Sequence, residues 1–196
     1  MKKQSLVIIL GVLLVAIGCA RQETEHLKFM DVSMGLNMDK FTKALEKKEF
    51  KHITKEPQAT IMEGKFCGDH VQIAIFETPE TKQIAMVAVE FPTYANKSTA
   101  RDMYDRYGKM LDEKYSGYFK NKQSKYFQNL IEIPDADNLH GKPGTTIGDY
   151  YTYFAVWEIP TGEIVSRVYN TSQFNVIYAD KLNYEALRDT AKSNDL

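Results

Sequence analysis

Two groups of side chains in this sequence carry atoms suited to catalysis or ligand binding. Within four residues, Cys67, Asp69 and His70 offer a thiol, a carboxylate and an imidazole. The second group lies in residues 134–147 and offers oxygen or imidazole ligands: Asp135, Asp137, Asn138 and His140. A hydrolase or metal-dependent enzyme that uses Asp69 and His70 with this loop is one hypothesis. It requires the two regions to meet in one pocket.

Neither group has the spacing of a known catalytic or metal site. A cysteine nucleophile needs a base within hydrogen-bond reach, whereas residues three apart on a strand, such as Cys67 and His70, point to opposite faces. We therefore expect Cys67 to be a small residue packed at a strand end. The four histidines show no HExxH spacing and no CxxC partner. We predict no catalytic residue, no metal site and no cofactor.

The 134–147 segment also differs from a calcium loop. Such loops place oxygen ligands at positions 1, 3 and 5, glycine at 6 and glutamate at 12. Counted from Asp135, these last three positions hold Leu139, His140 and Thr146. The alternative is a turn-rich surface loop, in which Asp, Asn, Pro and Gly serve the backbone geometry. Because loops on a rigid scaffold often carry binding, Asp135, Asp137 and His140 are binding candidates.

Cys19 is the residue whose chemistry the sequence predicts most clearly. Lys2 and Lys3 form a basic start, and the 12 residues from 6 to 17 are apolar. This run is too short to cross a membrane as a helix, which needs about 20 apolar residues. We therefore predict a signal peptide over residues 1–18, with small residues preceding Cys19 at the cleavage point. An ordinary secretory signal cut nearby is the alternative.

The segment Leu13-Leu14-Val15-Ala16-Ile17-Gly18-Cys19 resembles the cleavage box of bacterial lipoproteins. The resemblance implies that diacylglycerol is attached to the Cys19 thiol, that a peptidase cuts before it, and that the new amino terminus is acylated, often with palmitate. Ala16 departs from the leucine of the best-known box, but relaxed boxes are common in Bacteroidota-type bacteria. Two or three acyl chains anchor a protein durably, whereas one chain holds only marginally.

The mature chain has the size and composition of one folded domain. Removal of residues 1–18 leaves 178 residues with 23 basic and 26 acidic side chains, a net charge of −3. Nucleic acid binding is not expected, because it calls for a clustered basic face. We assign residues 19–26 to a polar, lipidated tether and residues 27–196 to a single α+β domain. With Cys19 lipidated, Cys67 has no intramolecular disulfide partner.

Hydrophobic periodicity predicts an alternation of helices and strands. A short strand is expected at 27–30. Asn37 should cap a helix over 38–48, and a second helix over 98–115 carries a stripe of Ala100, Tyr104, Tyr107, Leu111 and Tyr115, which favours core packing. The remaining expected elements are strands at 50–54, 59–66, 70–77, 84–91, 125–133, 149–159, 163–170 and 174–179 and a helix at 183–192.

The two halves of the domain, 37–92 and 98–180, follow a similar plan. Gly68-Asp69 precedes a strand, a turn with Pro79 and another strand, and Gly148-Asp149 precedes a strand, a turn with Pro160 and another strand. The helix sequences match at an offset of 66 residues and the Gly-Asp pairs at 80. The difference of 14 residues equals the length of 134–147. We predict two diverged helix-plus-four-strand units that share an antiparallel sheet, with the helices on one face and the other face partly open. Chance similarity is the alternative.

The predicted strand at 149–159 presents aromatic side chains on both faces, one face holding Tyr151, Tyr153 and Trp157. An open, aromatic sheet face favours a non-enzymatic binding module. We therefore predict binding by Tyr151, Tyr153, Trp157 and the 134–147 loop. The expected partner is another envelope protein, with a glycan as second choice.

The segment Met34-Gly35-Leu36-Asn37 leads into a predicted helix, and a meander of strands follows. This arrangement resembles the α+β units of the beta-lactamase-inhibitor-protein type and of the outer-membrane SmpA group. Leu27-Lys28-Phe29-Met30 and the Phe66 and Gly68 pair are similar to uncharacterised small lipoproteins of Bacteroidota. These resemblances imply a fold and a location but no activity. Because Ala20 follows Cys19, we expect the outer membrane, facing the periplasm, with the cell surface as the alternative.

Overall fold

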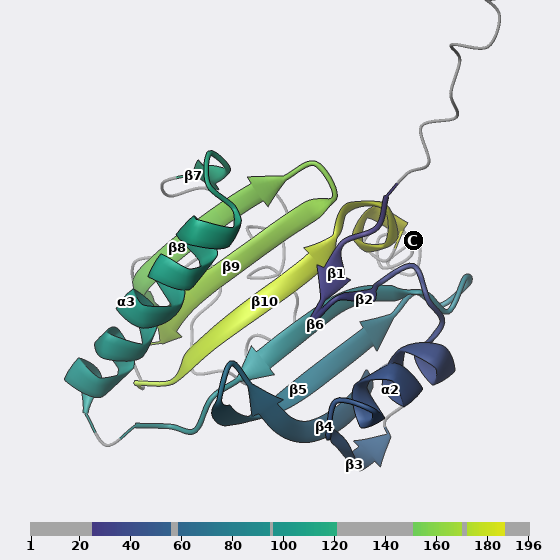
Figure 1. The fold of residues 1–196 in the computed structure, drawn as a ribbon, viewed down its shortest axis with the longest axis horizontal. Coiled ribbons are helices and arrows are strands. Elements are labelled where there is room, and N and C mark those ends of the chain that lie inside the picture. Colours follow the sequence, from purple (N-terminus) through teal and green to yellow (C-terminus); the bar gives the residue numbers. More distant parts are fainter. Residues whose placement is uncertain (1–24, 56–58, 95, 121–150, 170–171, 187–196) are drawn as a thin grey trace, which may run out of the picture.

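Figure 1 shows an α+β fold built around one antiparallel sheet. The structure is a computed structural model that describes residues 25–55, 59–94, 96–120, 151–169 and 172–186. Its elements, in chain order, are β1 (Lys28–Phe29), β2 (Val32–Ser33), α2 (Met38–Glu46), β3 (Lys51–Lys55), β4 (Ala59–Phe66), β5 (Asp69–Glu77), β6 (Ile84–Glu90), α3 (Lys97–Lys114), β7 (Phe119–Lys120), β8 (Tyr151–Ile159), β9 (Gly162–Tyr169) and β10 (Phe174–Asp180).

The main sheet has eight strands in the order β3-β4-β5-β6-β10-β9-β8-β7. Each neighbouring pair is antiparallel, and β6 meets β10 at the centre, from Met86 opposite Ala179 to Glu90 opposite Asn175. β3 and β7 form the two edges. The α+β class and the antiparallel sheet expected from the sequence are confirmed.

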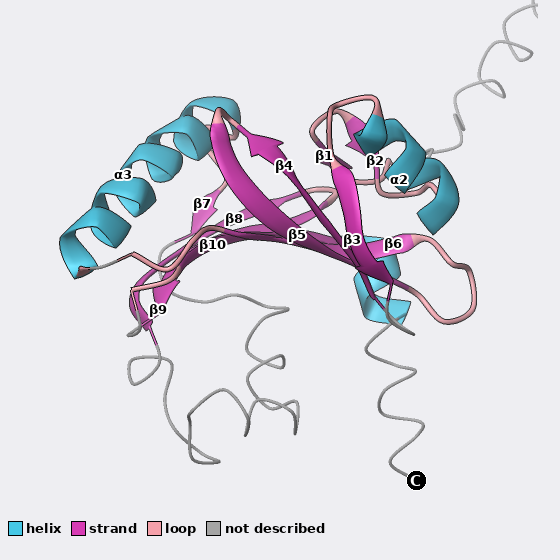
Figure 2. Cartoon of the chain, turned by 90° about the horizontal axis from the view of Figure 1, so that it is seen from below, coloured by secondary structure: helices cyan, strands magenta, loops and turns pink. Residues whose placement is uncertain are grey.

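Both long helices begin where an asparagine satisfies free backbone N–H groups. The Asn37 side chain accepts a hydrogen bond from the Lys40 N–H at 3.1 Å, and Asn96 accepts one from the Thr99 N–H at 2.9 Å. Figure 2 shows α2 and α3 on the same side of the sheet. Their buried side chains face it: Met38, Phe41, Thr42 and Leu45 from α2 and Ala100, Tyr107 and Leu111 from α3.

The main core lies between these helices and the sheet. Aromatic rings from both halves of the chain meet there, and Phe91 contacts Tyr107 at 4.9 Å and Phe174 at 4.8 Å between ring centroids. The β1–β2 hairpin adds the buried Phe29, whose ring lies 5.6 Å from that of Phe66. The two halves therefore share one core.

The opposite face of the sheet carries a second apolar cluster rather than the partly open surface expected from the sequence. Its members are buried: Met86, Ala88, Val156, Val165, Ile177, Ala179 and Tyr184. Ala88, Ile177, Val165 and Val156 form a continuous row across four strands. Tyr184 comes from residues 181–186, which are helical and lie on this side of the sheet (Figure 2). Of the described helices, α2 and α3 share one face of the sheet and the 181–186 helix lies on the other.

The predicted repeat differs from the structure in the placement of its second half. The expected strand at 125–133 and the 134–147 insertion lie outside the described residues, and the edge strand of the second half is β7 at Phe119–Lys120. The sequence comparison matched the β5–β6 hairpin with the β8–β9 hairpin. β5 and β6 are third and fourth from one edge, whereas β8 and β9 are second and third from the other. The two hairpins therefore occupy different places in the sheet, and the predicted match between them is wrong.

Ser166 on β9 allows a test of packing under α3. The Ser166 Oγ is fully buried and has no hydrogen-bond partner. It is the one side-chain polar atom of this kind among the described residues. An unsatisfied buried hydroxyl costs about 1–3 kcal/mol. We expect Ser166→Ala to raise the free energy of unfolding by about 1 kcal/mol, measured by urea denaturation. Thr42→Val is the control, since the buried Thr42 hydroxyl donates to Met38 O at 2.9 Å and its removal should lower stability. A loss of stability in Ser166→Ala would contradict the prediction.

Candidate functional site

Trp157 and Tyr153 belong to the helix-covered face of the sheet. Trp157 is 1% exposed, and its Nε1–H donates to Asp112 Oδ1 on α3 at 2.8 Å. Tyr153 is half-buried, with its ring 5.5 Å from that of Tyr104 and the Arg101 guanidinium 5.5 Å from its centroid. The expectation of an open aromatic face at these two residues needs correction, because α3 covers them.

The remaining predicted binding and lipidation residues are not placed by the structure. Cys19, Asp135, Asp137 and His140 lie outside the described residues. Tyr151 is part of β8, but its side chain also lies outside them. The structure therefore neither joins these side chains to Asp69 and His70 nor separates them.

Asp69 is engaged in structural contacts. Its carboxylate pairs with Arg106 of α3 and accepts a hydrogen bond from the Tyr107 hydroxyl at 2.7 Å. His70, the next residue, has an exposed side chain on β5. Partial burial raises the pKa of the neighbouring Cys67 thiol, while the nearby Lys114 ammonium acts in the opposite direction. The thiol is thus held in its neutral form, which is the poorer nucleophile.

The described residues were also compared with the requirements of a metal site and of a membrane-spanning helix. Among them, no three His, Cys, Asp or Glu side chains are grouped closely enough to hold a metal ion. Within the same part of the chain, no helix combines the length and the apolar character needed to cross a membrane.

The edge formed by α2 and β3 is an accessible surface that the described residues form. All five residues of β3 are exposed, and among the described strands its one neighbour is β4. The register shifts between His52 and Thr54, so Ile53 sits at an irregularity and is 46% exposed. An edge strand presents backbone N–H and C=O groups that can pair with another chain.

Two hollows flank this strand. The larger, about 490 Å³, is lined by Glu46, Glu49, Phe50, Lys51, Glu63, Gly64, Lys65 and His70. The smaller, about 180 Å³, lies against α2 and is lined by Met38, Asp39, Thr42, Lys43, Glu46, His52, Lys55 and Thr60. Phe50 forms an apolar wall of the larger hollow, and an added Cβ at Gly64 would lie 2.7 Å from its ring. Most of the residues that line the two hollows are polar or charged, and their aliphatic stems add apolar surface, which suits side chains of a protein partner.

Sequence reasoning missed this surface for an identifiable reason. Hydrophobicity alternates too weakly along residues 51–55 to reveal that both faces of this strand are exposed. In addition, the position of a strand at the edge of a sheet depends on pairing with strands distant in the sequence. The signal that was present is the lysine at each end, Lys51 and Lys55, since lysine is typical of edge strands.

Comparison of this chain with protein-family models, with curated proteins and with solved structures gives no match.

Proposed function

We propose that this protein is an outer-membrane lipoprotein, anchored through Cys19 and facing the periplasm, that binds another envelope protein without catalysing a reaction. The observation that carries the binding proposal is the fully exposed edge strand β3 with a hollow on each side. The anchor rests on the signal sequence and the lipobox resemblance. Residues 20–26 would act as the tether between the membrane and the domain.

Strand addition is the binding mode that this edge favours. An extended segment of a partner gains main-chain hydrogen bonds from β3, and its alternate side chains find sites in the flanking hollows. Lys51 and Lys55 disfavour pairing of β3 with a second copy of itself, since like charges opposite each other are destabilising. An acidic partner segment would turn the same charges into attraction. The proposed partner therefore presents an extended strand with acidic side chains opposite Lys51 and Lys55.

The predicted loop residues remain part of this proposal. Asp135, Asp137 and His140 are candidates for a second contact, together with Tyr151. Trp157 and the buried part of Tyr153 are not, because α3 covers them. Protease treatment of intact cells tests the membrane side, since release of the domain would place it on the cell surface.

We also propose that the two halves are diverged copies of one unit. Each half runs from a helix into four strands, α2 into β3–β6 and α3 into β7–β10. In both halves the strands proceed from the edge of the sheet to its centre. This relation pairs β5 with β9 and the Cys67-Gly68 turn with Pro160-Thr161. The insertion would then lie between the first and second strands of the second unit.

Site-specific crosslinking tests the proposed interface. With a benzoylphenylalanine in place of Ile53, we expect light-dependent capture of an envelope protein in the native membrane. The same substitution at Leu182, which is 39% exposed, is the matched control and should capture little. Lys51→Glu combined with Lys55→Glu should weaken capture about tenfold, because both attractions become repulsions. Equal capture from both positions, or none from position 53, would contradict the interface.

A further inference from the structure

The start of the domain is fixed to the end of β10 by a buried carboxylate. Asp180 accepts a hydrogen bond from the Leu27 N–H at 2.8 Å and lies 3.2 Å from His26 Nδ1. The His26 ring lies against Gly35, where an added Cβ would come within 2.4 Å of it. The chain therefore enters the domain at the end of the sheet where β10 terminates.

The proposed lipid anchor keeps this point of entry close to the membrane. Seven Cα–Cα steps separate Cys19 from His26, and a chain of that length spans at most about 25 Å. With Cys19 acylated and His26 held by Asp180, the end of β10 stays within that distance of the bilayer. This step rests on the proposed anchor, whereas the surface at this end of the sheet is a feature of the domain itself.

The turn before β7 lies at the same end of the sheet. Tyr118 O accepts a hydrogen bond from the Glu158 N–H at 3.0 Å. In the sheet, Glu158 is opposite Glu163, and Glu163 is opposite Ala179, the residue before Asp180. β7 itself lies three strand spacings, about 14 Å, from β10. Tyr118 and the chain entry therefore lie along one end of the four strands β7 to β10.

Exposed apolar side chains gather along this end. Tyr118 is 42% exposed, Phe119 on β7 is 49% exposed and Leu182 is 39% exposed. Leu182 follows Lys181, whose N–H donates to Thr161 O in the β8–β9 turn at 3.0 Å. Figure 1 shows β7, this turn and the tip of β10 at one end of the sheet.

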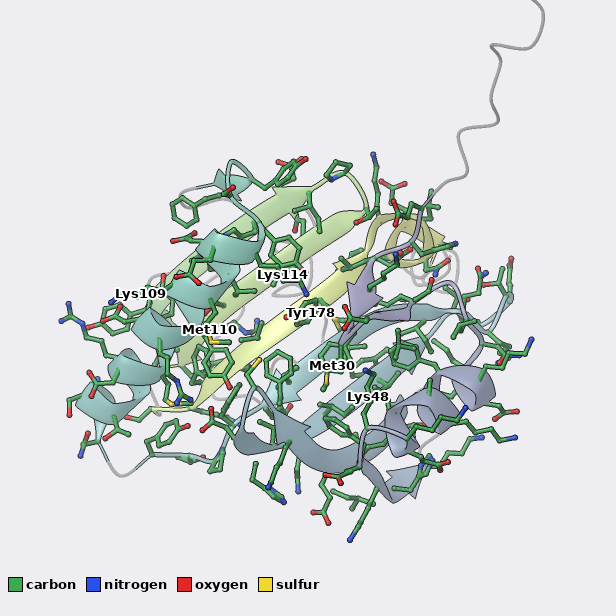
Figure 3. All side chains as sticks on the ribbon, viewed as in Figure 1. Met30, Lys48, Lys109, Met110, Lys114 and Tyr178 are labelled. Carbon is green, nitrogen blue, oxygen red and sulfur yellow. The ribbon has the colours of Figure 1, made fainter. Side chains whose placement is uncertain are left out.

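The other exposed large hydrophobic residues of the described chain lie elsewhere. Ile53 is on the β3 edge, and Met110 lies one turn before Lys114, the last residue of α3 (Figure 3). Of the five such residues in the described part of the chain, three therefore share the end of the sheet at which the anchor arrives.

This group of side chains suits the boundary between a membrane and water. Tyrosine is enriched at the level of the lipid head groups, because its ring is apolar and its hydroxyl remains hydrated. Tyr118 has this character, while Phe119 and Leu182 add apolar surface. The nearby charges have both signs, and Lys28 pairs with Glu25 at 3.1 Å. Apolar contact rather than attraction to charged lipids is therefore the expected driving force.

We infer that the end of the domain formed by Tyr118, Phe119 and Leu182 docks on the bilayer surface, with these side chains among the lipid head groups. The lipid surface, rather than a second protein, is the occupant. β3 lies four strand spacings, about 19 Å, from β10 on the other side of the sheet. The docked domain therefore leaves the β3 edge free for a partner.

Quenching by spin-labelled lipid tests this docking in the full, lipidated chain. In a Cys67→Ala background, a single cysteine is introduced as Leu182→Cys, Tyr118→Cys or Ile53→Cys and labelled with a nitrobenzoxadiazole fluorophore. The protein is reconstituted into phosphatidylcholine vesicles that contain a lipid with a nitroxide near its head group. Fluorescence should be lost at positions 182 and 118 and retained at position 53, whose native side chain is similarly exposed.

A longer tether separates docking from simple proximity to the membrane. Insertion of about ten Gly and Ser residues between Gln22 and Glu23 allows the anchored domain to move away from the bilayer. Docking predicts that quenching at position 182 persists in this variant. In the same long-tether chain, Tyr118→Glu should reduce the quenching. Met110→Glu is the matched control and should leave it unchanged, since Met110 is similarly exposed but lies away from this end.

Failure of the anchor and failure of the docking give different results. A chain that does not float with the vesicles on a density gradient contradicts acylation of Cys19 and removes the basis of the docking. A chain that floats but shows equal quenching at positions 182 and 53, or loses quenching at 182 with the longer tether, overturns the docking alone. Protection of position 182 from aqueous iodide without quenching by lipid would indicate contact between protein copies and would also overturn it.

Discussion

Replacement of Cys19 by alanine is expected to move the protein from the membrane fraction to the soluble fraction. Each buried acyl methylene contributes about 0.8 kcal/mol to membrane binding, so loss of two or three chains removes the anchor entirely. The measurements are cell fractionation and labelling with radioactive palmitate. The label should be present in the wild type and absent in Cys19→Ala.

Cys67→Ala is the matched control for this experiment. Cys67 is the free, exposed cysteine of the described residues, and its removal should change neither the label nor the fractionation. Palmitate label that persists in Cys19→Ala would contradict lipidation at this residue. A wild-type protein that is soluble and unlabelled would instead indicate an ordinary secretory signal.

Replacement of Asp180 by alanine is expected to lower the free energy of unfolding by about 3 kcal/mol. The residue is fully buried at the end of β10. Its carboxylate accepts hydrogen bonds from the Leu27 N–H at 2.8 Å and the Asn183 N–H at 3.0 Å, and lies 3.2 Å from His26 Nδ1. Alanine would leave two buried N–H groups without a partner, each costing about 1–3 kcal/mol.

The same contacts hold the start of the domain against its last strand. Loss of the carboxylate should therefore speed hydrogen exchange at Leu27 before the centre of the sheet is affected. Asp105→Ala serves as control, since Asp105 is exposed and its ion pair with Arg101 contributes about 0–1 kcal/mol. Chemical denaturation monitored by circular dichroism compares the two variants. Equal stability of Asp180→Ala and Asp105→Ala would contradict the structural role of Asp180.

The helices and most strands were predictable because their signals are local. Asn37 does cap a helix, and the stripe containing Ala100, Tyr107 and Leu111 does face the core. The helix at the end of the described chain starts at residue 181 rather than 183. Such boundaries depend on the capping of single turns, which periodicity does not resolve.

The candidate sites were harder to predict than the elements. Trp157 was expected on an open face because both faces of its strand are apolar, but the sequence does not say which face a helix covers. Its side chain lies under α3, bound to Asp112. Asp69 looked like part of a catalytic pair, yet Arg106 and Tyr107, about 40 positions away in the chain, occupy it. Both errors concern partners that are distant in sequence.

The type and approximate place of the helices and strands follow from the sequence, since hydrophobic period and asparagine caps act within a few residues. Three features depend on tertiary contacts: β6 meets β10 at the centre, β3 is left at the edge and the Cys67-Gly68 turn rests on α3. The physical reason is that strand pairing and helix packing join residues tens of positions apart. Their energies depend on which surfaces meet rather than on any local pattern.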